Sequence, residues 1–312
     1  MSITTQTILP MLSVCIITYN QEKYIAQTLD GILMQHTNFE FDVVIGEDCS
    51  TDNTKNIILQ YASQYPDKIK LLPSTHNFGV RKNFEQTLLA CTGKYIAICE
   101  GDDYWTDINK LQKQVDFLEA NEDYKICFHN TAIVYEDTGK SENANKQEQP
   151  ITTTMIDLID HWYMMTCSMV FKNELKVFPT WFTKAFNTDY ALQMLIMGNG
   201  GKIGYLPDVM AVYRKHNEGE SARTWGADPY FWLLFLFKNI DATFNKKYHK
   251  QIQIREKEIV GILASYYKTK ITTSSDGIMT NAKNFVRFCF MKLYIPGLYY
   301  SKFLKQKNLK SI

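Results

Sequence analysis

Four apolar runs, each followed by a segment with helical periodicity, constrain the fold of this 312-residue chain more than any other feature. The first run, MLSVCIIT at 11–18, is continuous and rich in β-branched residues. Such a run is typical of a strand that is buried on both faces of a parallel sheet. After it, Ile25, Leu29 and Ile32 recur at the spacing that places side chains on one face of a helix.

The same order of strand and helix repeats three more times before residue 123. Further strands are predicted at 41–48, 68–74 and 94–100, and each is followed by a helical pattern. Consecutive units of this kind predict an α/β fold with a doubly wound, Rossmann-like sheet.

Beyond Asp123 the alternation of strand and helix ends, which indicates that the sheet becomes mixed in strand direction. Strands are expected at 124–136 and 164–172. The polar stretch 137–150 lacks apolar periodicity, so it is expected to be a mobile loop. A helix is expected around 187–197, and a hairpin over 201–216 is expected to complete the sheet.

Polar residues gather where the four predicted parallel strands end. They are Thr18, Tyr19, Asn20, Glu47, Asp48, Asn77, Glu100, Gly101, Asp102 and Asp103. In doubly wound sheets, ligands bind beyond the carboxyl ends of the strands. The sequence therefore predicts a ligand site at this edge of the sheet.

The stretch CEGDDYW at 99–105 places three carboxylates within four residues, directly after a buried strand. Like charges this close repel unless solvent, a cation or a basic ligand offsets them. No GxGxxG turn follows the first strand and no GxxxxGK[ST] loop occurs, so a diphosphate would need another counter-charge. We therefore interpret Glu100, Asp102 and Asp103 as a site for Mg²⁺ or Mn²⁺. Alternatively, one of these acids, Asp103 above all, only caps the following helix.

Four stretches together resemble the family 2 glycosyltransferases with a GT-A fold, in that family's order and spacing across residues 11–220. They are SVCIITYNQEKYIAQTLDGILMQ, VVIGEDCSTDNT, HNFGVRKNFEQTLLACTGKYIAICEGDDYWTD and YLPDVMAVYRKHNEG. The resemblance implies a GT-A domain at 1–225, with a nucleotide-sugar-binding half at 11–123 and an acceptor half at 124–225. A helical C-terminal extension is expected at 226–312.

The resemblance also assigns the acidic turn. The family's DxD motif falls on Glu100, Gly101 and Asp102, which implies donor binding by all three residues. Glu100, which is one methylene longer, stands where the family usually has Asp, and the resemblance implies a role for it toward the donor ribose and a role for Asp102 toward the metal.

Further donor contacts follow from the resemblance in the first half. Asp48 matches the carboxylate that reads the nucleotide base, and a carboxylate accepts the N3–H of uracil or thymine, which cytosine lacks. The alternative is that Asp48 caps the next helix. Thr18, Tyr19 and Asn20 match the segment that borders the base and the ribose. Arg81 matches a cation beside the nucleotide, and its alternative is a solvated helix face.

In the second half, the resemblance implies one catalytic carboxylate. An acceptor hydroxyl that attacks the anomeric carbon needs a base to take its proton. The family places an Asp at the start of a helix here, which corresponds to Asp189, and Thr188 precedes it where an acidic pair is common. Arg214 and His216 match a segment that closes over the diphosphate, with Arg214 toward phosphate and His216 toward the metal. The alternative for Asp189 is a helix N-terminal acid.

The resulting expectation is an inverting, metal-dependent transfer from a nucleotide-diphosphate sugar, a UDP-sugar above all, to a glycan or lipid-linked acceptor. A sugar nucleotidyltransferase is the first alternative, but TYNQEKY is a poor match to the glycine-rich basic loop of that class. A catalytically inactive nucleotide-sugar-binding module is the second alternative, and the presence of Asp48, Asp102 and Asp189 argues against it.

Charge and composition bear on location and partners. The net charge of +1 argues against a nucleic-acid binder. The chain has no signal-peptide pattern and its cysteines suit a reducing compartment, so it is expected in the cytoplasm. Residues 277–312 carry seven Lys or Arg, no acids and several aromatics. Such a tail suits the anionic inner face of the plasma membrane, unless it packs its aromatics on the catalytic domain.

Overall fold

The computed structural model describes residues 9–145, 148–219 and 226–273. The chain divides into two compact units, Met1–Ala222 and Arg223–Ile312. The first unit contains a mixed α/β sheet, and the second contains helices in its described part. The expected fold class is confirmed.

The four strand–helix units of the first half form as predicted. Their elements are β1 (Leu12–Thr18), α1 (Ile25–Leu33), β2 (Phe41–Glu47), α2 (Thr54–Gln64), β3 (Ile69–Leu71), α3 (Val80–Ala90), β4 (Tyr95–Ile98) and α4 (Lys110–Ala120). β1 runs parallel to β2 on one side and to β4 on the other, and every residue of β1 is buried. Burial on both faces explains why its sequence is apolar without alternation.

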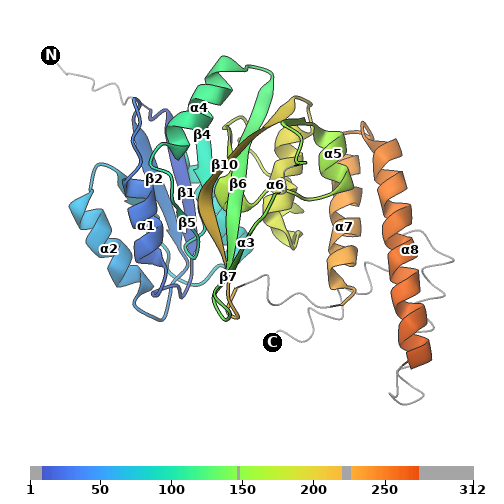
Figure 1. Ribbon diagram of the computed structural model, residues 1–312. Helices are drawn as coiled ribbons and strands as arrows, with labels where there is room; N and C mark the ends of the chain where they lie inside the picture. The colour runs from blue at the N-terminus through green and yellow to red at the C-terminus, as the bar shows by residue number, and fades with distance from the viewer. Residues whose placement is uncertain (1–8, 146–147, 220–225, 274–312) are drawn as a thin grey trace. The chain divides into compact units, whose positions relative to one another are not determined.

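The second half continues the same sheet. Its strands are β5 (Tyr104–Trp105), β6 (Tyr124–Tyr135), β7 (Lys140–Asn143), β8 (Thr152–Thr153), β9 (Val170–Lys172) and β10 (Lys202–Lys215). Among the described residues the sheet has ten strands, in the order β3-β2-β1-β4-β9-β6-β10-β5, with β7 on β6 and β8 on β10. β9 is antiparallel to both β4 and β6. Figure 1 shows β6 and β10 side by side along their length.

Three expectations for the second half are wrong. Residues 201–216 form no hairpin, because β10 is one long strand parallel to β6, with an irregular register where Pro207 lacks a backbone donor. The stretch 137–150 is not simply a loop, since β7 pairs with β6. All four β7 side chains are exposed, so no apolar period marks this strand. The strand expected at 164–172 is shortened to β9, after a 3₁₀ turn at Thr166–Ser168.

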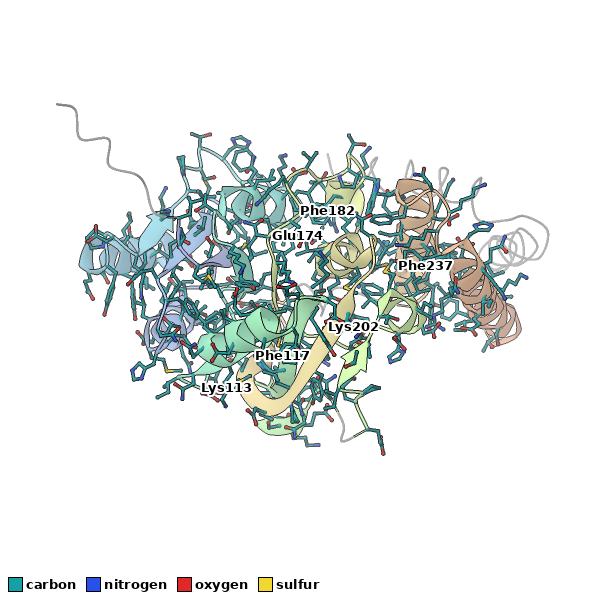
Figure 2. The ribbon with its side chains drawn as sticks, turned by 90° about the horizontal axis from the view of Figure 1, so that it is seen from above. Lys113, Phe117, Glu174, Phe182, Lys202 and Phe237 are labelled. Atoms are coloured by element: carbon teal, nitrogen blue, oxygen red, sulfur yellow. The ribbon has the colours of Figure 1, made fainter. Side chains whose placement is uncertain are left out.

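The segment that leads to the predicted catalytic helix is anchored on the first half. Helix α5 (Met155–Asp160) begins with a capping box between Thr154 and Asp157. A 3₁₀ turn at Phe182–Lys184 then precedes α6 (Thr188–Met197). Phe182, labelled in Figure 2, is fully buried and stacks on Phe178 at 4.4 Å and on Phe84 of α3 at 6.5 Å between ring centroids. These aromatic contacts tie the approach to α6 to helix α3.

The second unit contains α7 (Asp228–Thr243) and α8 (His249–Thr273). Nδ1 of His249 lies 2.8 Å from Oδ2 of Asp241, so the two side chains are within hydrogen-bonding distance across the turn between the two helices. Among the described residues, no helix has both the length and the apolar character that crossing a membrane requires. The basic tail at 277–312 lies outside the described residues.

Candidate active site

The loops after β1 and β2 are fastened to each other at the carboxyl edge of the sheet. Asn20 has a left-handed backbone with φ 53°, a conformation that Asn adopts more readily than most residues. Its backbone N–H donates to Ser50 Oγ at 2.9 Å, and its Oδ1 accepts from the backbone of Thr51 at 2.8 Å. Thr18 is buried, whereas Tyr19 is 44% exposed. Of this predicted segment, Tyr19 therefore offers a ring to solvent while Asn20 holds the loop.

Asp48 is only 2% exposed and holds the segment before α3. Its two carboxylate oxygens accept the backbone N–H groups of Phe78 at 2.7 Å and Gly79 at 2.8 Å. The cap role considered as its alternative is not observed, because α2 begins only at Thr54, and Ser50 N donates instead to Glu47 Oε1 at 2.6 Å within the loop. A carboxylate oxygen has more than one acceptor site, so Asp48 retains capacity for a further donor. The predicted contact with a nucleotide base stays a prediction.

Gly101 allows the acidic turn to approach the end of β1. Its N–H donates to Ile17 O at 3.0 Å, and its carbonyl accepts from Thr28 Oγ1 at 3.0 Å. A Cβ atom here would lie 2.4 Å from Gln21 Oε1 and 2.7 Å from Thr18 Oγ1, closer than any side chain tolerates. The middle position of the DxD-like motif is therefore restricted to glycine by the packing of the β1 end.

The two aspartates of the acidic turn differ sharply in surroundings. Asp103 is 1% exposed, and its Oδ1 accepts the backbone N–H of Arg214 at 2.9 Å. Burial, and then the adjacent charge of Asp102, raise the pKa of Asp103 well above its ordinary value. Asp103 therefore fixes β10 to the turn, and it is not the solvated helix cap considered above. Glu100 lies at the start of this turn, where its carbonyl accepts from Asp103 N at 3.0 Å.

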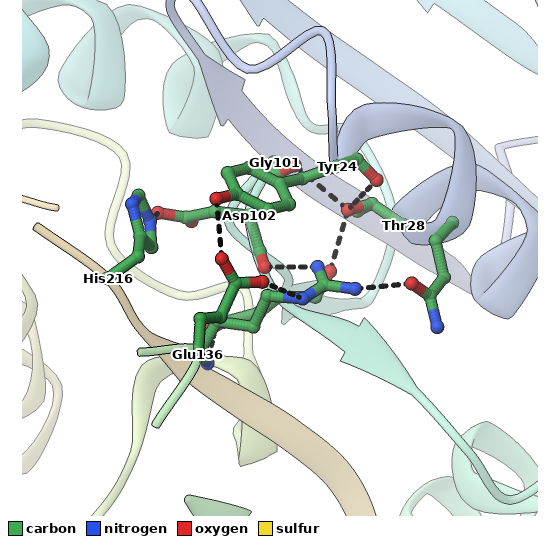
Figure 3. A network of polar contacts seen from close by, with 9 residues as sticks. Tyr24, Thr28, Gly101, Asp102, Glu136 and His216 are labelled. Carbon is green, nitrogen blue, oxygen red and sulfur yellow. Dashed lines mark hydrogen bonds and ion pairs between the residues drawn. The ribbon is translucent and has the colours of Figure 1, made fainter. Parts of the chain in front are cut away.

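The structure brings together the two residues predicted to hold a metal. Nε2 of His216 lies 3.1 Å from Oδ2 of Asp102, and Figure 3 shows both side chains in one contact network. This contact with Asp102 raises the pKa of His216 above its ordinary value. A separation of 3.1 Å is that of an ordinary hydrogen bond, and it is also close to the about 3.0 Å between neighbouring ligands of an octahedral ion, so the spacing is compatible with either.

No larger ligand cluster accompanies this pair within the parts of the chain that the structure describes. There, no three His, Cys, Asp or Glu side chains gather closely enough to form a metal site by themselves. Nδ1 of His216 is buried and has no hydrogen-bond partner among the described residues. The Asp102 carboxylate is thus the ligand type that Mg²⁺ and Mn²⁺ prefer, and the His216 imidazole is a ligand type of transition metals, which favours Mn²⁺ over Mg²⁺.

Arg214 is 8% exposed, and its guanidinium group contacts other residues of the protein. Its Nη1 donates to the carbonyl of Asp102 at 2.5 Å, and its Nη2 donates to Gln27 Oε1. The guanidinium carbon also lies 4.4 Å from the ring centre of Tyr104 and 5.0 Å from that of Tyr24. These contacts orient the acidic turn through the carbonyl of Asp102. The predicted contact of Arg214 with phosphate stays a prediction.

Arg81, predicted to lie beside the nucleotide, contacts the second half. It occupies the first turn of α3, and its guanidinium carbon lies 5.1 Å from the centre of the Phe186 ring. Phe186 precedes Asp189 by three residues, so Arg81 joins α3 to the start of α6. Its role toward the donor stays a prediction.

Asp189 lies in the first turn of α6 and is partly buried. Its Oδ2 accepts a hydrogen bond from Thr166 Oγ1 at 3.2 Å. Burial raises the pKa of Asp189 above its ordinary value of 3.8. A carboxylate with a raised pKa binds a proton more strongly, which is the property that a general base needs.

Sequence reasoning missed several residues that shape this site, among them Tyr24, Gln27, Glu136 and Thr166. Tyr24 donates to Glu136 at 2.7 Å across 112 residues of sequence. No local pattern marks such a pair, because only the sheet order brings its members together. Thr166 could have been noticed as a polar residue inside a predicted strand.

Comparison with known proteins identifies the sequence family. The sequence model of glycosyl transferase family 2 matches residues 13–178. The uncharacterized protein Rv1520 of Mycobacterium tuberculosis is 37% identical over 211 residues, which cover 67% of this chain and 60% of that relative. The dTDP-rhamnosyl transferase RfbG of Shigella flexneri is 30% identical over 161 residues, covering 50% of this chain and 53% of the relative. The chain thus matches less than two thirds of the length of these relatives.

Solved structures support the fold independently of sequence. Staphylococcus aureus TarS 1–349, in complex with UDP-GlcNAc, aligns with a TM-score of 0.56 at 18% identity, over 90% of this chain and 81% of that one. The mannosyltransferase PcManGT of Pyrobaculum calidifontis, in complex with GDP-Man and Mn²⁺, gives a TM-score of 0.56 at 19% identity, over 97% of this chain and 85% of that one. At such identities the likeness concerns the GT-A fold alone. With the family match covering more than half of its length, this chain belongs to glycosyl transferase family 2.

Proposed function

We propose that the chain is an inverting glycosyltransferase that moves a sugar from a UDP-sugar to a hydroxyl of a glycan or lipid-linked acceptor. The observation that carries this proposal is the 3.1 Å pair of Asp102 and His216 at the carboxyl edge of the sheet. The family supplies the reaction class. TarS and PcManGT, which share the fold, are solved with nucleotide sugars, and PcManGT also with Mn²⁺.

In this proposal, Asp102 and His216 would hold Mn²⁺ or Mg²⁺, which would supply positive charge beside the leaving diphosphate. Glu100 and Gly101 line the donor beside it, with Glu100 toward the ribose. Arg214 keeps the carbonyl of Asp102 in place, which orients the turn.

The nucleotide is proposed to lie along the loops after β1 and β2. Tyr19 has an exposed ring to border the base, and Thr18 and Asn20 shape the loop that carries it. Asp48 accepts N3–H of uracil while it still holds the segment before α3. Arg81 adds positive charge at the start of α3.

Asp189 is proposed to act as the general base. The acceptor oxygen bonds to the anomeric carbon on the side opposite the diphosphate, and the bond from that carbon to the diphosphate oxygen breaks in the same step. The acceptor proton passes to Asp189, and the configuration inverts. Thr166 orients the carboxylate through its hydrogen bond. The proposal assigns 11–123 to the donor and 124–225 to the acceptor.

A screen of UDP-, dTDP- and GDP-sugars, each with Mn²⁺ and with EDTA, tests the function. Release of nucleoside diphosphate from a UDP-sugar, dependent on Mn²⁺ and absent in Asp102→Asn, is the expected result. Full release in EDTA would remove the metal from the proposal. Pyrophosphate release from a nucleoside triphosphate would instead identify a nucleotidyltransferase.

A further inference from the structure

A continuous set of contacts joins the start of α1 to the acidic turn and to the end of β10 (Figure 3). Tyr24 Oη donates to Glu136 Oε2 at 2.7 Å, and Glu136 Oε1 lies 3.5 Å from Arg214 Nε. Arg214 in turn donates to the carbonyl of Asp102 at 2.5 Å. The network therefore begins at Tyr24, outside the acidic turn, and ends on the backbone of a proposed metal ligand.

Tyr24 also contacts the other proposed ligand. Its ring centroid lies 4.9 Å from that of His216, with the two planes tilted by 45°. On the same ring, the Arg214 guanidinium carbon lies 5.0 Å from the centroid. One aromatic side chain thus contacts both the imidazole of His216 and the guanidinium that orients Asp102.

The two nitrogens of the His216 imidazole differ in their polar contacts. Nε2 contacts Asp102, whereas the buried Nδ1 has no hydrogen-bond partner among the described residues. The backbone two residues earlier is fixed, since the N–H of Arg214 donates to Asp103. Asp102 and the Tyr24 ring are therefore two of the groups that contact this largely enclosed imidazole.

The two carboxylate oxygens of Glu136 have different partners. Oε2 accepts the hydrogen bond from Tyr24 Oη, and Oε1 faces Arg214 Nε. The hydrogen bond fixes the position of the hydroxyl end of the Tyr24 ring, which contacts His216.

We infer that Tyr24 and Glu136 are positioning residues, which hold His216 and Asp102 at the spacing that a divalent cation needs. The inference rests on the proposed function, because it assigns a cation to this pair. Neither residue touches the cation in this scheme. Both act through the ring contact on His216 and through Arg214.

Tyr24→Phe isolates the effect, because it removes one hydroxyl and keeps both ring contacts. Tyr135→Phe is a matched control: Tyr135 Oη donates to Glu142 Oε1 at the same 2.7 Å, one residue before Glu136 but outside the network. Mn²⁺ binding is measured by the electron paramagnetic resonance signal of free Mn²⁺, in the full chain with saturating UDP. The unfolding midpoint of each variant is recorded alongside.

The expected result is Mn²⁺ binding about 10-fold weaker in Tyr24→Phe, the size typical for loss of a group that orients a metal ligand. The Tyr135→Phe variant should bind as the wild type does. In turnover, Tyr24→Phe should raise the Mn²⁺ concentration for half-maximal rate and leave kcat at saturating Mn²⁺ nearly unchanged. Glu136→Gln, which keeps an acceptor for Tyr24 but removes the charge beside Arg214, should also weaken Mn²⁺ binding.

The outcomes separate this inference from the proposed function. If the wild type binds Mn²⁺ with UDP, and Tyr24→Phe binds it as tightly as Tyr135→Phe, the positioning role is overturned and the proposed function stands. If the wild type binds no Mn²⁺ under these conditions, the cation assignment and the inference both fail. Should Tyr24→Phe fold poorly, Glu136→Gln decides, and wild-type affinity in that variant overturns the inference.

Discussion

His216 Nε2 lies 3.1 Å from Asp102 Oδ2, although 114 residues separate the two in sequence. One comes from the turn after β4 and the other from the residue that follows β10. Their contact depends on the sheet order, in which β9 and β6 lie between β4 and β10. Both halves of the sheet therefore contribute to the candidate site, and Asp102 and His216 can be tested separately.

Removal of the Asp102 carboxylate should abolish metal-dependent turnover. Asp102→Asn keeps the size of the side chain and loses the charge that a hard cation prefers. Metal charge stabilisation is worth several kcal/mol, so a loss of about 100-fold or more in kcat/KM is expected. Nucleoside diphosphate release against Mn²⁺ concentration measures it, with Asp67→Asn, an exposed acid, as the control. Equal activity in both variants would contradict the metal assignment.

Asp189→Asn should lower kcat by about 10²–10⁴-fold, the range for loss of a general base. Donor affinity should persist, because the acidic turn and the loops after β1 and β2 are untouched. Calorimetric titration with UDP and Mn²⁺, together with single-turnover rates, separates the two effects. Near-normal kcat would move the base to another residue.

The pH dependence should carry the signature of Asp189. Since burial raises its pKa above 3.8, the rate should rise with pH through an acidic limb above that value, as the base ionises. The effect on stability has the opposite sign. The protonated form of Asp189 contributes to the free energy of unfolding below pH 3.8, and this contribution is lost as the pH rises through the raised pKa.

The rate and the free energy of unfolding, each measured between pH 3.5 and 8, check both statements. This range is wide enough because the pKa values of carboxyl groups in folded proteins spread by roughly one unit around their ordinary values. Thr166→Val removes a hydrogen bond that lowers the Asp189 pKa, so it should move the limb to higher pH. A limb that stays in place in Thr166→Val would show that another group titrates.

Gly101→Ala should disrupt the acidic turn. The added Cβ would lie 2.4 Å from Gln21 Oε1 and 2.7 Å from Thr18 Oγ1, so one of the two segments must shift. Overpacking of this kind destabilises by about 1–3 kcal/mol, and turnover should fall with it. Gly261→Ala is the control, because an added Cβ there meets nothing within 4 Å inside helix α8. That change should stabilise the chain by about 0.4–1 kcal/mol, as measured by denaturant unfolding.

The basic segment 277–312 should bind anionic lipid, at ~1 kcal/mol per cation near the surface. We expect the full chain to sediment with phosphatidylglycerol vesicles, but not with phosphatidylcholine vesicles, and to be released by high salt. Replacing Lys302, Lys305, Lys307 and Lys310 with Gln should weaken this binding. If neither form sediments, or both do equally, the tail has another role.

Much of the first half of the sheet could be predicted from sequence, because β1, β2 and β4 are wholly buried and are separated by amphipathic helices. The same reasoning failed for β10, where a proline within a long strand resembles a turn. It failed for β7 because exposed residues on an edge strand leave no periodic signal. Both errors arise where backbone pairing, rather than side-chain burial, decides the structure.

The candidate site divides in a similar way. Residue type and position at strand ends indicated Asp48 and Asp102, because carboxylates directly after buried strands are conspicuous, whereas Asp189 was indicated only by the resemblance to the family 2 glycosyltransferases. What each acid contacts could not be predicted, since the bond from Arg214 N to Asp103 depends on how two distant strands align. The pair of Tyr24 and Glu136 had no signal at all.

The place of β9 in the sheet has a consequence for how this protein folds. β4 pairs with β1 on one side and with β9 on the other, and β9 is contributed by residues 170–172. A fragment that stopped before β9 would leave the β4 backbone edge unpaired, which favours association with other chains. Synthesis must therefore proceed past Lys172 before the edge of β4 is covered by its partner strand. The family match, which ends at residue 178, includes that strand.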